Sequence, residues 1–376
     1  LVRSGVITSV HAFSGGVLGT YFLVFTLCML FASALLIVSR HKVLAQSNTF
    51  ESFLSKESSF LINNLILVGF AFAVFWGTIF PLISQAVRGV QVTMGPPFFN
   101  SISLPLGLAL FLLMGICPLI AWRRASAKNV LDNFLLPALV GVVMVVVLYF
   151  LQVRNLRALI AFAIATFTIC TILLELLRGT RVRHRLTGEV YPLAFLNLML
   201  RNRRRHGGYI IHLGLVLILI AITGSHAFAL DSTKTLKLGD SYEFGNYRLT
   251  YDVLNQKDVG HQRQAVYADF SVFDRKTGEY LGKVEPQKVF YPTAQDQPAT
   301  EVGLRSTPKE DLYIILSTWN QDSSATFKFY VNPLVSWLWI GGVVVVLGAI
   351  FALWPGRGSA TGSKYLQTVR LSQSTK

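Results

Sequence analysis

The stretch that decides the fold, Arg201 to Gly224, reads RNRRRHGGYIIHLGLVLILIAITG. Four arginines and a histidine end at Gly207, and an apolar run about as long as one membrane span follows. A basic cluster beside such a run is typical of a membrane helix with one end anchored at the cytoplasmic surface. One imidazole, that of His212, lies inside the apolar run and needs a physical explanation.

The environment of His212 predicts a neutral imidazole with a partner, because an ionised group in hydrocarbon costs roughly 2.5 to 3.5 kcal/mol. A rise of about 1.5 Å per residue places His212 roughly 6 Å beyond Gly208, in the leaflet nearest the arginines. Small residues at Gly207, Gly208 and Gly214 allow either another helix or a flat ligand to approach closely. These residues alone leave two partners open: a hydrogen bond from another helix, or a metal such as haem iron.

The composition indicates a polytopic membrane protein, with a mean hydropathy of +0.51, 52% hydrophobic residues and 14% charged residues. The net charge of +15 does not predict a nucleic-acid partner, because the basic residues lie at helix ends. The three cysteines lie in apolar segments without a Cys-x-x-Cys pair, which argues against a disulfide framework and a thiolate metal site. The chain begins at Leu1 without a signal peptide, so we expect a fragment or product of something longer.

Seven apolar runs are long enough to span a membrane. They lie at about 16–38, 60–83, 101–122, 134–151, 156–177, 208–229 and 334–354. The connections 39–59, 123–133 and 178–205 and the tail from 355 carry eighteen lysines and arginines. The other short connections carry only Arg3, Arg88 and Arg154, with Arg157 at the edge of a helix as a fourth. The excess predicts that 230–333 lies outside and the tail in the cytoplasm. We therefore expect a six-helix membrane bundle with an outer N-terminal segment (1–229), a periplasmic β domain (230–333), a last transmembrane helix (334–354) and a cytoplasmic tail (355–376).

The segment between the sixth and seventh runs differs in composition, since fourteen of the nineteen acidic residues lie between 229 and 332. Alternating polarity predicts strands at 247–254, 264–273, 280–289, 311–317 and 326–331. Asp274 to Gly278 has the composition of a hairpin turn. The predicted fold class is a polytopic α-helical membrane protein of about seven spans, with a small all-β domain inserted before the last helix. This domain has no catalytic constellation in its sequence, so a docking platform is the economical interpretation.

The other titratable residues outside the β domain have ordinary explanations. The patterns place His11 beside the outer membrane surface and His226 at the outer rim, roughly 21 Å along the helix from His212. His41 and His184 are expected to be solvated in cytoplasmic loops. Glu175 lies three residues before Arg178, a spacing at which the two side chains can pair on one helical face.

Residues 85–100, which include two prolines and two phenylalanines, are expected to form a rigid outer loop.

Several stretches together resemble the CcmF family of cytochrome c-type biogenesis proteins, which are membrane haem-handling proteins. They are RSGVITSVHAF (3–13), GPPFFN (95–100), GGYIIH (207–212), EVGLRSTPKEDLY (301–313) and VNPLVSWLW (331–339). The resemblance implies a haem lyase component of the inner membrane that accepts haem from a periplasmic haem chaperone. It also implies a role in the thioether attachment of haem to apocytochrome c, together with other haem lyase subunits.

The resemblance further implies a role for individual residues. His11 matches one of two outer histidines that hold the substrate haem, and His212 matches one of two membrane histidines that hold a resident haem b. A porphyrin bound beside His212 would account for Gly207, Gly208 and the lone histidine, and neutral imidazole is a good iron ligand.

The departures from the family are also informative. The tryptophan-rich WWD segment and the first histidine of each pair would lie upstream of Leu1, so we expect a missing N-terminal half to complete both sites. Two alternatives remain. One is a non-catalytic scaffold for cytochrome assembly. The other is a solute transporter, which predicts inverted repeats, broken helices or midplane charges that this sequence does not show.

Overall fold

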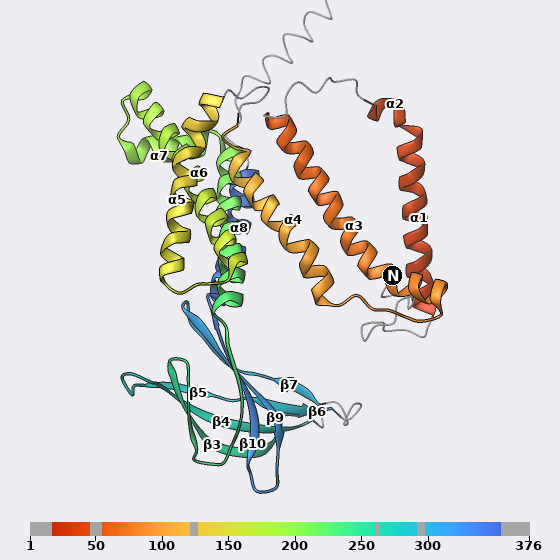
Figure 1. Ribbon diagram of the computed structural model, residues 1–376, viewed down its shortest axis with the longest axis vertical. Coiled ribbons are helices and arrows are strands. Elements are labelled where there is room, and N and C mark those ends of the chain that lie inside the picture. The colour runs from red at the N-terminus through yellow and green to blue at the C-terminus, as the bar shows by residue number, and fades with distance from the viewer. Residues whose placement is uncertain (1–16, 46–54, 121–126, 261–262, 292–297, 355–376) are drawn as a thin grey trace, which may run out of the picture. The chain divides into compact units, whose positions relative to one another are not determined.

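The computed structural model describes residues 17–45, 55–120, 127–260, 263–291 and 298–354 (Figure 1). Its contacts divide the chain into two compact units, Leu1–Leu135 and Leu136–Lys376. Seven helices in the described ranges are long and apolar enough to cross a membrane. The seven predicted spans are therefore confirmed, each displaced at its ends by a few residues or extended by polar turns.

The first unit contains α1 (Val17–Ser39), α2 (His41–Leu44), α3 (Lys56–Arg88) and α4 (Pro96–Ile116). The expectation of an outer loop over 85–100 is largely wrong, because α3 continues to Arg88 and α4 already begins at Pro96. Proline suits the first helical turn, where its missing N–H costs nothing. The rings of Phe98 and Phe99 fill the space beside Gly77 of α3, where a Cβ would lie 2.7 Å from each.

The helices that follow are α5 (Ala127–Phe150), α6 (Leu156–Thr187), α7 (Tyr191–Arg201), α8 (Arg203–Phe228) and, after the β domain, α9 (Val335–Leu353). The expectation of a loop over 178–205 is wrong, because α6 continues for ten residues beyond the predicted span and α7 follows at once. Gly188 ends α6 with φ +70°, a conformation that glycine adopts without strain. Pro192 lies in the first turn of α7. These two residues were the available signal for a break between two helices.

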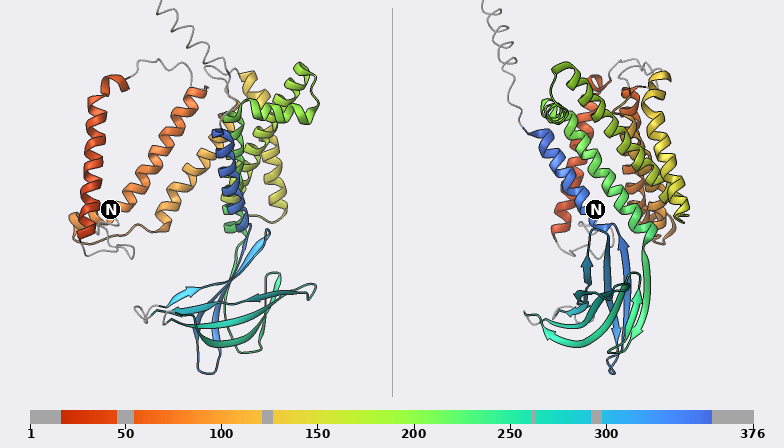
Figure 2. Two further views of the ribbon diagram at one scale, coloured as in Figure 1. Left: turned by 180° about the vertical axis from the view of Figure 1, so that it is seen from behind. Right: turned by 90° about the vertical axis from the view of Figure 1, so that its left-hand side faces the viewer.

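The β domain is a sandwich of two antiparallel sheets (Figure 2). One sheet has the order β1-β10-β9-β8, and the other has the order β2-β3-β4-β6-β7, with β5 also pairing with β4. The bounds are β1 (Leu230–Leu236), β2 (Ser241–Phe244), β3 (Tyr247–Asp258), β4 (Gln264–Asp274), β5 (Tyr280–Val284), β6 (Gln287–Phe290), β7 (Ala299–Glu301), β8 (Gly303–Ser306), β9 (Glu310–Trp319) and β10 (Ala325–Pro333). The predicted fold class, a helical membrane protein with an all-β domain before the last helix, is confirmed.

The strand predictions fail at one internal break and at the short strands. The predicted strand 280–289 is two strands, because Glu285 and Pro286 interrupt it and proline cannot donate a ladder hydrogen bond. The predicted turn at Asp274 is present: its carboxylate accepts hydrogen bonds from the backbone of Lys276 and Thr277, and Gly278 has φ +73°. The strands β1, β2, β7 and β8 were missed because they are short or mostly polar.

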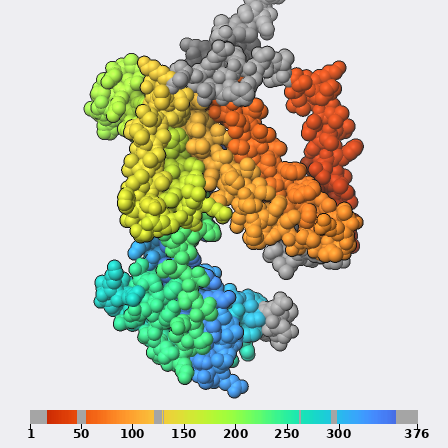
Figure 3. All heavy atoms as spheres, viewed as in Figure 1, coloured from red at the N-terminus to blue at the C-terminus, as the bar shows by residue number. Residues whose placement is uncertain are grey.

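The interior of the sandwich is built from side chains of both sheets. Tyr251 and Phe270 of one sheet meet Phe327 and Phe329 of the other, and all four are fully buried. The rings of Phe270 and Phe327 pack edge to face with centroids 4.7 Å apart. In the space-filling view, side chains close over this interior (Figure 3).

The chain enters and leaves the sandwich through neighbouring elements. β1 follows α8 with one residue between them, and β10 leads through Leu334 into α9. β1 and β10 pair along their length, from Leu230 opposite Val331 to Leu236 opposite Ala325. α8 and α9 likewise lie side by side, as Figures 1 and 2 show. The same two chain segments therefore form one helical hairpin and one edge of the sandwich.

Candidate haem-binding helix and its basic end

α8 is positioned by a polar cap and by close contacts with α9. The side chain of Asn202 accepts a hydrogen bond from the backbone of Arg205, which satisfies one of the free N–H groups of the first turn. Gly214 of α8 and Gly341 of α9 face each other, and a Cβ on either would lie 2.7 Å from the other's carbonyl oxygen. Glycines at such a crossing let two backbones meet directly.

Gly207 belongs to the same α9-facing side. A Cβ at Gly207 would lie 2.6 Å from the Cβ of Ala352, so α9 fills the space beside it. At Gly348 of α9, a Cβ would lie 2.8 Å from the backbone nitrogen of Ile211. Of the two explanations offered for the small residues, a neighbouring helix accounts for Gly207 and Gly214. The assignment of Gly207 to haem binding stays a prediction.

Gly208 and His212 lie on a different side of α8. They are four residues apart, so they share one helical face. A Cβ on Gly208 would meet no atom within 4 Å, which leaves this part of the face open. The His212 side chain is half-buried, and its Nδ1 is buried without a hydrogen-bond partner among the described residues. A buried nitrogen of this kind is costly unless another group engages the ring.

The basic end of α8 forms a polar cluster with α6. Arg205 makes an ion pair with Glu175 and donates a hydrogen bond to the hydroxyl of Tyr209 at 3.1 Å. Glu175 was expected to pair with Arg178, and the partner identified in the structure is Arg205 of α8. His206 is only 5% exposed, and its Nδ1 lies 2.9 Å from the carbonyl oxygen of Asn202. The basic cluster is thus partly built into the helix packing.

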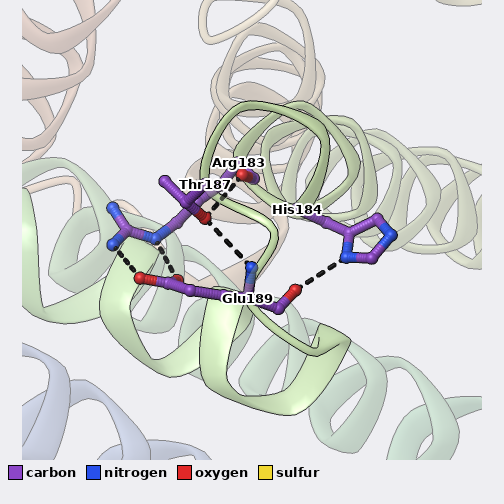
Figure 4. Close-up of polar contacts among 4 residues, drawn as sticks. All are labelled: Arg183, His184, Thr187 and Glu189. Atoms are coloured by element: carbon purple, nitrogen blue, oxygen red, sulfur yellow. Dashed lines mark hydrogen bonds and ion pairs between the residues drawn. The ribbon is translucent and has the colours of Figure 1, made fainter.

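A second polar cluster closes the turn between α6 and α7 (Figure 4). Arg183 donates two hydrogen bonds of 2.8 Å to the carboxylate of Glu189, which lowers the pKa of that carboxyl. The Nδ1 of His184 lies 2.7 Å from the carbonyl oxygen of Glu189, and its ring stacks on Tyr191 at 4.2 Å. The expectation that His184 is solvated in a loop is therefore wrong: it is half-buried and belongs to this turn.

The remaining histidines are placed as follows. His226 is exposed in the last turn of α8, on the same helix as His212. His41 is exposed, with its Nδ1 2.9 Å from the carbonyl oxygen of Val38. His11 and His261 lie outside the described residues. Within the described ranges, no group of three or more His, Cys, Asp or Glu side chains is placed to hold a metal ion. A metal ion bound at His212 would therefore need further ligands that the described side chains do not supply, as the porphyrin supplies them to haem iron.

The stretches near 307 and 336 form a junction that sequence reasoning did not identify. The hydroxyl of Ser336 donates to the carbonyl oxygen of Thr307 at 2.8 Å, and the indole of Trp337 donates to that of Pro308 at 2.9 Å. The backbone N–H of Leu334 also donates to the carbonyl oxygen of Lys309. These bonds attach the β8–β9 turn to the first turn of α9. Two of the stretches that carry the family resemblance therefore have a structural role here.

Comparisons with known proteins agree with this architecture. Residues 227–333 match a family model described as the CcmF C-terminal beta-sandwich. The chain is 29% identical over 357 residues to the cytochrome c-type biogenesis protein CcmF of Pseudomonas aeruginosa, and 28% identical over 365 residues to CcmF of Escherichia coli. These alignments cover 94% and 95% of this chain, and 52% and 53% of the two proteins.

A solved structure gives the same result. The chain named Cytochrome c Heme Lyase CcmF matches with a TM-score of 0.65 and 30% sequence identity, over 81% of this chain and 46% of that chain. Together, the candidate spans and the family model give the class of the protein. It is a multi-pass membrane protein whose β sandwich is of the CcmF C-terminal type. The chain is similar to CcmF proteins over nearly its whole length, and it spans about half the length of the curated relatives that it matches.

Proposed function

We propose that this chain acts in cytochrome c maturation as part of an inner-membrane haem lyase. In this role it accepts haem from a periplasmic haem chaperone and supports its thioether attachment to apocytochrome c. The names of its relatives, cytochrome c-type biogenesis proteins and a haem lyase, support this reaction class. Because the chain corresponds to about half of each relative, the proposal includes an N-terminal half that completes the sites.

The observation that carries the proposal is the unpartnered Nδ1 of His212. This nitrogen is buried in an apolar helix, and the face beside it is open at Gly208. Neutral imidazole is a common axial ligand of haem iron, and the absence of a side chain at Gly208 leaves room for a flat ring. The donor set of this face therefore fits haem b.

In this proposal, His212 holds haem b through one ring nitrogen, and α9 fixes the orientation of α8 through the crossing at Gly214. Bound haem b supplies a one-electron redox couple. The apolar surroundings keep His212 neutral and therefore able to act as a ligand. His11, which lies outside the described residues, is proposed as the ligand of the substrate haem on the outer side.

The β sandwich is proposed as a periplasmic docking platform for the haem chaperone or apocytochrome c. Several of its described titratable groups are engaged in structural contacts, such as the carboxylate of Glu310, which accepts a hydrogen bond from Asn246 at 3.1 Å. Addition of cysteine thiols to haem vinyl groups depends on holding both partners in a reactive orientation. A rigid platform joined to α9 through Ser336 and Trp337 is suited to that task.

The proposal is tested by replacing His212 with alanine in the complete protein purified from membranes. Haem b per protein, measured as the pyridine haemochrome, is expected to fall several-fold or more. His226→Ala is the matched control, because His226 is on the same helix but exposed, and it should leave resident haem unchanged. Unchanged haem b in the His212→Ala protein would contradict the assignment, and an unmodified protein without haem b would favour the scaffold alternative.

A further inference from the structure

The hollow surface between α6, α7 and α8 has no role in the proposed haem chemistry. One cavity of about 350 Å³ is lined by Glu175, Arg201 and Arg205, among others. A neighbouring cavity of about 430 Å³ shares Glu175 and Arg201 with the first and adds Arg178 and Arg183. Both volumes are in the range of small-molecule binding sites.

The cavities combine excess positive charge with apolar walls. Four arginines and one glutamate line them, and the side chains of Leu186 and Leu198 contribute apolar surface. Arg205 is paired with Glu175, and Arg183 is paired with Glu189. Arg201 lines both cavities, is exposed, and makes no hydrogen bond or ion pair with the described part of the chain. The cavities therefore offer one arginine, Arg201, that forms no ion pair with a described carboxylate.

α7 gives this surface the character of a membrane interface. The helix carries exposed apolar side chains at Leu193, Leu196 and Leu200, and a single buried one, Ala194. In Figures 1 and 2, it lies at a steep angle to α8, at the end of α8 away from the sandwich. A short amphipathic helix in this arrangement is suited to lie in the headgroup region with its apolar side chains toward the acyl chains.

We propose that the α6–α7–α8 surface binds the phosphate group of an anionic phospholipid. Basic hollows between transmembrane helices on the cytoplasmic side are suited to acidic headgroups. Arg201, supported by Arg178, engages the phosphate, while the leucines of α7 contact the acyl chains. This site is independent of His212, so its test does not depend on haem.

The test measures the affinity of the purified complete protein for a fluorescent phosphatidylglycerol. Arg201→Gln is expected to raise the Kd about fivefold, the change that corresponds to about 1 kcal/mol per basic residue at a membrane surface. Arg178→Gln, which removes the supporting arginine of α6, should also weaken lipid binding. Arg201→Lys keeps the positive charge and should retain most of the affinity. Arg204→Gln is the matched control: Arg204 is exposed on the first turn of α8 but lines neither cavity, so its Kd should equal that of the unmodified protein.

Three results would overturn the proposal. Equal losses for Arg201→Gln and Arg204→Gln would mean a general surface-charge effect. Displacement of the lipid by inorganic phosphate at similar concentration would identify a soluble anion as the ligand. A loss of bound haem in Arg201→Gln, with lipid affinity unchanged, would instead assign the arginine to a haem propionate. Thermal melting of each variant, expected to match the unmodified protein, separates these results from misfolding.

Discussion

The β sandwich and α8 each bury the polar end of a ring, and the two rings differ in whether a partner lies within the described chain. The hydroxyl of Tyr251 is deep in the sandwich and donates to the carbonyl oxygen of Ser323 at 3.0 Å. The imidazole of His212 is in an apolar helix, and its buried Nδ1 has no partner among the described residues. The difference indicates that Tyr251 is satisfied by the sandwich itself, whereas the ring of His212 is placed to engage another group.

The largest expected effect tests whether the sandwich is held together by its own core. Leu312 of β9 is fully buried, and Leu304 of the neighbouring β8 is 51% exposed. Leu312→Ala removes buried apolar volume and is expected to cost about 2 to 5 kcal/mol, because the surrounding core relaxes only partly. Leu304→Ala should change stability by less than about 0.5 kcal/mol. Chemical denaturation, monitored by proteolysis within the sandwich, measures both, and equal losses would contradict this description of the core.

The second prediction concerns the buried tyrosine of the sandwich. Burial raises the pKa of Tyr251 to about 12, above the usual value of 10 in an unfolded chain. The unfolded chain therefore loses the proton first as the pH rises, and the stability from this group, full below pH 10, is lost between about pH 10 and 12. The loss corresponds to roughly 2 to 3 kcal/mol.

The control for this prediction is Tyr251→Phe, in which there is no hydroxyl to ionise. It should lose about 1 kcal/mol with the hydrogen bond to Ser323, yet show a weaker fall in stability above pH 10. The pKa of Tyr247 is also raised to about 12 by burial, so Tyr247 accounts for the fall in stability with pH that remains in Tyr251→Phe. Melting curves over the alkaline range make the comparison, and an unchanged slope in Tyr251→Phe would contradict it.

A smaller effect is expected where α8 meets α9. Gly341→Ala places a Cβ 2.7 Å from the carbonyl oxygen of Gly214, so the helices must separate, at a cost of about 1 to 3 kcal/mol. Gly342→Ala is the matched control, because no atom lies within 4 Å of its Cβ. The melting temperature of the detergent-solubilised protein should fall only for Gly341→Ala. Equal effects of the two changes would show that the crossing does not depend on close backbone contact.

The sequence was most informative where one periodic property extended over many residues. Seven apolar runs and the long strands at 247–258 and 264–274 were identifiable because hydropathy and alternation are averaged over many positions. Short strands could not be identified in this way, because too few positions are averaged: β7 has three residues, and β2 and β8 have four each. The helical turns beyond 177 were missed because their arginines suggest a loop, although a charged helix leaving the bilayer keeps its own hydrogen bonds.

The position of the candidate residue was evident from the sequence, but its surroundings were not. His212 was identifiable because an imidazole in an apolar span is rare. Its neighbours were not, because the partner of Gly207 is Ala352, more than a hundred residues away in the chain. The pairing of Glu175 with Arg205 was missed for the same reason: local spacing favoured Arg178, and only the packing of α6 on α8 brings Arg205 near.

The central claim is that the imidazole of His212 binds haem iron. The most direct measurement is the visible absorption spectrum of the complete protein with His212→Gly, recorded before and after addition of free imidazole. We predict that the variant loses the low-spin haem b spectrum and that imidazole restores it, because the added ring occupies the place of the missing side chain. A variant with an unaltered haem b spectrum before imidazole is added would contradict the account.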